Sequence, residues 1–233
     1  MSAATKVVTG AAARIRDGNP EPRLPCVVLL DVSGSMSGRK IEELNSGLVT
    51  FGKELLKDEL AASRVEVAVC AFGGEVKIVQ DFVSASQFKP PVLTAGGGTP
   101  MATGILLSYE LYEGRKARYE ASDLDSYGPW IFMVSDGEPT DSADLLDKAK
   151  RRIVQGESQP REKQIAFFPV GVEGANMQQL RRISVREPLM LQGYNFGRMF
   201  AWLGQSLRNM SRKEVGDDVA LENPQSPKGW AKR

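Results

Sequence analysis

The chain has 233 residues, of which 42% are hydrophobic, and its 30 lysines and arginines balance 29 aspartates and glutamates to a net charge of +1. This composition supports a buried core and excludes global disorder, and it offers no basic surface of the kind that nucleic acid requires. The sequence contains no histidine, which excludes the usual Ser-His-Asp and Cys-His nucleophilic sites and any zinc site with a histidine ligand.

Apolar periodicity in the first half of the chain predicts three strands and a helix. Residues 26–30 form a short, continuous apolar run, typical of a strand that is buried on both faces. Residues 40–56 carry apolar side chains at helical spacing and predict a helix. Two further apolar segments, 64–72 and 76–82, are separated by a short connector with two glycines, which predicts a hairpin and an antiparallel strand at the sheet edge.

The second half of the chain continues the alternation after a long loop. Residues 89–101 are rich in proline and glycine and predict an irregular loop, followed by a helix over 101–112 that ends in a polar stretch. Strand-like and helix-like segments then alternate up to Arg212, beyond which the chain turns polar. These segments are strands at 130–135, 164–172 and 188–192 and helices at 143–154, 176–183 and 197–210.

Repeated strand-helix units predict an α/β fold with a mostly parallel sheet and helices on both faces. We assign one domain to residues 24–212, between a flexible N-terminal segment over 1–23 and a C-terminal extension over 213–233. In open α/β sheets, ligands gather beyond the carboxyl ends of the strands, at the point where the strand order reverses. Functional residues are therefore expected at that edge.

The two cysteines and the start of the chain indicate a cytoplasmic protein. Cys26 and Cys70 lie inside apolar runs, which suits reduced, buried thiols better than a disulfide. The N-terminal segment lacks the continuous apolar core of a secretory signal, and no later stretch reaches the ~20 apolar residues of a membrane span. We expect a protein that is not attached to a membrane and does not bind nucleic acid.

Oxygen-bearing side chains occur in three segments that this fold would bring to one sheet edge. LLDVSGS leaves the first strand, TAGGGTP leads into a helix, and WIFMVSDGEPTD leaves the fourth strand. In extended backbone, the alternate residues Asp31, Ser33 and Ser35 would point the same way. With Thr99 and Asp136 they supply two carboxylates and three hydroxyls, hard donors that suit a small divalent cation. We predict a magnesium site, for which manganese and calcium are alternative ions.

The same segments resemble a known family. DVSGSM is similar to the D-x-S-x-S element of von Willebrand factor A domains, and GGGTPM and VSDGEPTD are similar to the threonine and acidic loops of its metal-ion-dependent adhesion site (MIDAS). The resemblance implies a Rossmann-like, three-layer α/β/α fold with one antiparallel edge strand. It implies that Ser33, Ser35 and Thr99 bind the metal most directly, and that Asp31 and Asp136 hold it through water or at longer range.

Family members usually bind a partner through the metal rather than catalyse a reaction. We therefore expect no enzymatic activity and a protein partner whose Asp or Glu carboxylate completes the metal site. LPCVVLLDVSGSMSGRKIEELNSGL, FKPPVLTAGGGTPMATGI and FAWLGQSLRNMS followed by GWA further resemble TerY-type proteins, associated with tellurite resistance and chemical-stress responses in bacteria. This closer resemblance implies a scaffold or metal-linked sensor that operates alongside a protein kinase and a protein phosphatase.

Each segment also has a local structural interpretation. Serine and aspartate are preferred at helix starts, so DVSGS alone could be a strand followed by a helix cap. Asp141 or Ser142 is expected to cap the helix after the acidic loop, with Asp141 the preferred candidate, and Glu138 is expected to be solvated. The occurrence of all three segments together favours the metal site.

Two other functions stay open. Asp31 at a strand end also resembles the nucleophile of haloacid-dehalogenase-type, magnesium-dependent phosphatases. Those enzymes carry a second aspartate two residues later as general acid, whereas this chain has Ser33, whose hydroxyl cannot serve that role. The third interpretation is a structural docking domain without a functional metal.

Overall fold

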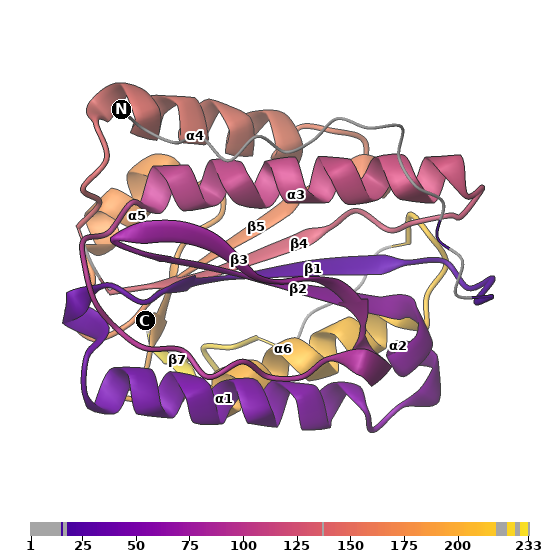
Figure 1. The fold of residues 1–233 in the computed structure, drawn as a ribbon, viewed down its shortest axis with the longest axis horizontal. Helices are drawn as coiled ribbons and strands as arrows, with labels where there is room; N and C mark the ends of the chain where they lie inside the picture. Colours follow the sequence, from indigo (N-terminus) through magenta and orange to yellow (C-terminus); the bar gives the residue numbers. More distant parts are fainter. Residues whose placement is uncertain (1–14, 16–17, 137, 218–222, 227–228, 233) are drawn as a thin grey trace.

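The computed structural model describes residues 15, 18–136, 138–217, 223–226 and 229–232. In these residues a seven-stranded sheet is covered by helices on both faces (Figure 1). The strands are Leu24–Asp31 (β1), Val65–Gly73 (β2), Glu75–Ser84 (β3), Trp130–Ser135 (β4), Ala166–Gly171 (β5), Leu189–Leu191 (β6) and Ala231–Lys232 (β7). The α-helices are Arg39–Leu55 (α1), Glu59–Arg64 (α2), Met101–Ala121 (α3), Ala143–Glu157 (α4), Met177–Ile183 (α5) and Phe196–Ser211 (α6). Short 3-10 helices cover Gly34–Met36 (η1), Ala85–Gln87 (η2) and Arg161–Lys163 (η3).

The sheet confirms the predicted fold class. Its strand order is β3-β2-β1-β4-β5-β6-β7, and β1 pairs in parallel with both β2 and β4. The edge strand β3 pairs antiparallel with β2, as the hairpin prediction requires. Chain order runs outward in both directions from β1 and β4, so the strand order reverses between these two strands. Their carboxyl ends are where this fold places a ligand.

Two apolar layers hold the sheet between its helices. Figure 1 shows α3, α4 and α5 on one face and α1, α2 and α6 on the other. Residues of β1 alternate between the layers: Val27 and Leu29 pack in the layer that contains α3 and α4, and Val28 and Leu30 pack in the layer that contains α1 and α6. Every residue of β1 is buried, which explains why this strand reads as a continuous apolar run.

Three elements differ from the sequence predictions. The helix predicted over 101–112 continues to Ala121, because part of the polar stretch packs on the sheet through Arg115 and Tyr119. The short helix α2 was not predicted. The strand predicted to be the last, β6, is followed by β7, which pairs antiparallel with it and thus gives the sheet a second antiparallel edge.

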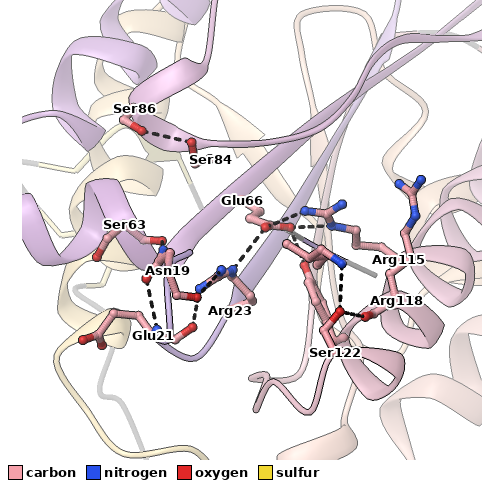
Figure 2. Close-up of polar contacts among 12 residues, drawn as sticks. Asn19, Glu21, Arg23, Ser63, Glu66, Ser84, Ser86, Arg115, Arg118 and Ser122 are labelled. Atoms are coloured by element: carbon pink, nitrogen blue, oxygen red, sulfur yellow. Dashed lines mark hydrogen bonds and ion pairs between the residues drawn. The ribbon is translucent and has the colours of Figure 1, made fainter. Parts of the chain in front are cut away.

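The N-terminal end of the sheet contains a buried ion-pair network, shown in Figure 2. Glu66, only 2% exposed, accepts hydrogen bonds from Arg115 at 2.7 and 2.6 Å and from the Tyr119 hydroxyl at 2.6 Å. Arg23, 1% exposed, lies 3.3 Å from Glu66 and donates to the carbonyl of Asn19 at 2.8 Å. Asn19, Glu21 and Arg23, which lie in the segment assigned from sequence as flexible, are bonded to the domain, and most of that segment lies outside the described residues.

Both cysteines are free and buried, as predicted, and they lie in opposite apolar layers. Burial raises the pKa of the Cys70 thiol to about 12, and burial also raises the pKa of Cys26. Neither thiol is therefore a reactive nucleophile in the folded protein.

Candidate metal centre

Asp31 lies at the carboxyl end of β1, beside the end of β4. The register pairs Leu30 with Val134, which brings Asp31 next to Ser135. The two carboxylate oxygens of Asp31 accept hydrogen bonds from the backbone N–H of Ser33 at 2.8 Å and from the Ser135 hydroxyl at 2.6 Å. Asp31 is fully buried, and this burial raises its pKa, against the lowering effect of the two hydrogen bonds.

A 3-10 turn, rather than an extended strand, brings the two predicted serines together. The backbone of Ser33 is extended, and η1 begins at the next residue, Gly34. The turn places the Ser33 and Ser35 hydroxyls 2.9 Å apart, and Ser35 donates to Asp136 at 2.6 Å. Ser33 and Asp136 are buried whereas Ser35 is exposed, so the cluster opens to solvent at Ser35.

The glycine loop, residues 94–100, is bonded to this turn through backbone groups. Gly34 donates to the carbonyl of Gly97 at 2.9 Å, and Gly96 donates to the carbonyl of Val32 at 2.7 Å. Gly97 has a φ of +75°, and a Cβ at this position would lie 2.5 Å from the Cα of Gly74. Only glycine fits this left-handed position so close to another backbone segment.

Thr99 connects the glycine loop to the acidic loop, residues 136–142. Its carbonyl accepts from the backbone N–H of Thr140 at 2.9 Å, and its own N–H donates to the Thr140 hydroxyl at 3.2 Å. Thr99 is 6% exposed. These bonds hold Thr99 at the same sheet edge as the predicted serines.

Asp141 caps a different helix from the predicted one. Its carboxylate accepts from the backbone N–H of Ala102 at 2.8 Å and from the Thr103 hydroxyl at 2.8 Å, in the first turn of α3. Ser142 is the residue that caps α4, where its side chain accepts from the backbone N–H of Leu145. The preference for Asp141 as the cap of the next helix was therefore wrong, and the bonds of Asp141 instead fasten the acidic loop to α3.

The structure gathers all five predicted residues at one sheet edge. Side-chain hydrogen bonds link Ser33, Ser35 and Asp136, and the Ser33 N–H donates to Asp31. The glycine loop that contains Thr99 is bonded to the serine turn through the Gly97 carbonyl. Their role as metal ligands stays a prediction. Glu138, predicted to be solvated, is exposed and accepts a hydrogen bond from Asn176 at 2.5 Å.

Sequence reasoning missed three residues of this centre. Ser135 and Thr140 support Asp31 and Thr99 by the hydrogen bonds described above. Lys40 forms an ion pair with Asp136. No distinct signal in the sequence marks Lys40, because the adjacent Arg39 is also a cation in the first turn of α1 and pairs with Glu43 at the surface.

The donor set fits a hard divalent cation. The described residues contain no group of three or more acidic or thiol side chains placed to hold a metal, so hydroxyl oxygens would have to complete any coordination shell. No ion pair of Asp31 occurs in the part of the chain that the structure describes, although a buried carboxylate is costly without a cation. The Lys40 ammonium supplies a positive charge to Asp136 but not to Asp31. If both acids are ionised, the centre carries more negative than positive charge, and a divalent cation would balance it.

Comparisons with known proteins give a family and a fold. The family model of the von Willebrand factor type A domain matches residues 26–197. A comparison with curated proteins finds no match.

Solved structures with low sequence identity share the architecture. The vWF domain of the type V pili tip protein Mfa5 from Porphyromonas gingivalis is 13% identical, with a TM-score of 0.57 over 86% of this chain and 99% of that chain. Proximal thread matrix protein 1 from the mussel byssus is 14% identical, with a TM-score of 0.57 over 82% of this chain, which spans only 49% of the mussel chain. The manganese-loaded TRAP protein of Plasmodium vivax is 14% identical, with a TM-score of 0.52 over 78% of this chain and 73% of that chain.

Proposed function

The chain belongs to the von Willebrand factor type A domain family, and we propose that it is a divalent-metal-dependent protein-binding module without enzymatic activity. Asp31, Ser33, Ser35, Thr99 and Asp136 would form its MIDAS. The observation that carries this proposal is the meeting of three loops at one sheet edge, with two buried acids beneath an exposed serine. Such an edge is where this fold places a ligand.

Magnesium is the proposed ion, and manganese or calcium would suit the same hard oxygen donors. A solved relative in fold is described as manganese-loaded, which supports a divalent ion in this architecture. When bound, the ion would offer a coordination position to an Asp or Glu carboxylate of a partner protein. Ser35, as the exposed donor, marks the side from which the partner would approach.

The hydrogen bonds of Asp31 support binding over phosphoryl transfer. Both of its carboxylate oxygens accept hydrogen bonds, and the residue has no exposed surface. A nucleophile has to reach a substrate phosphorus atom, which this buried carboxylate could do only after the loops open. The position of the general acid is taken by Ser33.

The sequence resemblance to TerY-type proteins extends the proposal to a cellular role. We propose a cytoplasmic scaffold or sensor in a bacterial tellurite or chemical-stress response, which works with a protein kinase and a protein phosphatase. No helix among the described residues has the length and apolar character to cross a bilayer. Copurification from the native host, with and without chelator, tests this role: a kinase or phosphatase recovered only in the presence of magnesium supports it.

Titration calorimetry with magnesium and manganese tests the metal site. Ser33→Ala and Thr99→Ala should each weaken binding at least tenfold, whereas Ser46→Ala, which removes the same hydroxyl from the exposed face of α1, should leave it unchanged. Absence of binding in the unmodified chain would instead support a structural docking domain. Turnover of a generic phosphate ester that Asp31→Asn abolishes would support the phosphatase.

A further inference from the structure

Lys40 places a positive charge inside the candidate metal centre. Its ammonium forms an ion pair with one carboxylate oxygen of Asp136, while the other oxygen accepts the hydrogen bond from Ser35. The Lys40 side chain is 18% exposed and that of Asp136 is 0% exposed, so the pair lies largely out of solvent. Both oxygens of Asp136 are thus occupied by groups of the chain itself.

The position of Lys40 in its helix is unfavourable for a cation, and its ion pair with Asp136 offsets this cost. Lys40 is the second residue of α1, where the helix dipole disfavours a cation. The preceding N-cap residue, Gly38, offers no side-chain cap that could compensate. Glu42 supplies an acid in the same turn, and the contact that the ammonium itself makes is with the buried Asp136.

An incoming divalent cation would compete with this ammonium. Two cations beside one carboxylate repel each other, and the repulsion doubles when one of them is divalent. A lysine has a long, flexible side chain, and a strongly hydrated ammonium gains solvation when it moves out to water. The loop after β5 lies beside the ammonium, since a Cβ on Gly174 would lie 3.9 Å from the ammonium nitrogen, an ordinary contact distance.

We propose that Lys40 is an internal counter-cation that neutralises Asp136 when no metal is bound and must leave it for a divalent ion to bind. This inference rests on the proposed metal-binding function and adds its regulation. The ion pair keeps the acidic loop in place without metal, and it lowers the affinity of the centre for metal. Half-saturation with the ion, and with it partner binding, then requires a higher ion concentration than in a chain without the Lys40 charge.

Magnesium titration of the full chain, after treatment with chelator and dialysis, tests this role. Lys40→Met keeps the aliphatic length and removes the charge, and it should bind magnesium on the order of tenfold more tightly than the unmodified chain. Lys53→Met removes the same charge from the last turn of the same helix and should change the affinity less than twofold. Lys40→Gln serves as a second neutral variant if the methionine variant does not fold.

A stability measurement gives a readout that does not depend on affinity. In chelator, Lys40→Met should unfold at a lower urea concentration than the unmodified chain, because Asp136 is left buried without a cation. Saturating magnesium should remove this difference. Lys53→Met should show neither effect.

The outcomes separate this inference from the function on which it rests. If neither the unmodified chain nor Lys40→Met binds magnesium, the proposed metal function fails, and the inference fails with it. If the unmodified chain binds and Ser33→Ala does not, while Lys40→Met binds equally or more weakly, the metal function stands and the competing role of Lys40 is wrong. If Lys40→Met binds magnesium more tightly than the unmodified chain and Lys53→Met does not, both the metal function and the competing role of Lys40 are supported.

Discussion

Replacement of Gly97 by alanine tests whether the packing of the glycine loop shapes the metal centre. The residue has a φ of +75°, which costs an L-residue about 1–2 kcal/mol. Its Cβ would lie 2.5 Å from the Cα and 2.6 Å from the N of Gly74, in the turn between β2 and β3. Both neighbours are backbone atoms, so no side chain can move away, and overpacking of this kind costs about 1–3 kcal/mol. We expect Gly97→Ala to lower the free energy of unfolding by about 2–5 kcal/mol.

Gly96→Ala is the matched control for this substitution. A Cβ at Gly96 meets no atom within 4 Å, and the substitution keeps the N–H that donates to Val32. A surface substitution of this kind changes stability by less than about 0.5 kcal/mol. Urea unfolding of the two variants in chelator measures the difference, and equal stabilities would refute the steric argument.

The same pair of variants tests the link between the loop and the metal. The backbone bond from Gly34 to the Gly97 carbonyl joins the glycine loop to the serine turn, and a shift of Gly97 would move Thr99 away from it. Magnesium affinity should therefore fall at least tenfold in Gly97→Ala and stay unchanged in Gly96→Ala. A destabilised Gly97→Ala that binds magnesium normally would show that the loop does not hold the centre.

Two further substitutions test the other buried and capping charges. Glu66→Gln should lower the free energy of unfolding, measured in urea, by about 3–5 kcal/mol, because it removes the carboxylate that pairs with the buried Arg23 and the half-buried Arg115. Glu113→Gln is the control, since Glu113 is exposed in its ion pair with Arg152, and its effect should stay within about 0.5 kcal/mol. Asp58→Ala should cost about 1 kcal/mol at neutral pH, since the backbone N–H of Ala61 and then the Arg212 side chain lower the pKa of Asp58. An acid with a lowered pKa stabilises the fold above its ordinary pKa of 3.8 and loses this contribution as the pH falls below it, so the urea midpoints of variant and unmodified chain should converge in acid. A difference that does not change with pH would contradict this assignment.

Buried strands and the oxygen-bearing loops could be predicted from the sequence because both depend on local patterns. Residues 130–135 were predicted as a strand with the observed bounds, since a strand covered on both faces leaves an uninterrupted apolar run. Of the candidate metal ligands, Asp31 ends such a strand and Asp136 follows another directly, and parallel strands end at one sheet edge. The convergence of Asp31 and Asp136 follows from that topology.

Features that depend on distant partners could not be predicted. The C-terminal part of α3 is polar in sequence, so it was not predicted as helix. Its Arg115 and Tyr119 are bonded to Glu66, which lies about fifty residues earlier in the chain. Strand β7 has only two residues and is defined by its pairing with β6, so it is too short to show an alternation of apolar and polar residues in the sequence. Asp141 caps α3 rather than the next helix in the chain, and this contact depends on the folded position of the acidic loop, which the sequence does not show.

The buried acids at the two ends of the sheet are paired differently, and this contrast supports the candidate metal centre at the carboxyl end. At the N-terminal end, Glu66 meets two arginines, so its charge is fully compensated among the described residues. At the carboxyl end, Asp136 pairs with one lysine, and Asp31 accepts hydrogen bonds only from neutral groups, the Ser33 N–H and the Ser135 hydroxyl, among the described residues. Arginines thus compensate the buried acid at the N-terminal end, whereas at the carboxyl end, where the strand order reverses, the buried acids outnumber the cations. A buried deficit of this kind is costly unless a ligand supplies the missing charge, which is the physical reason to expect a cation there.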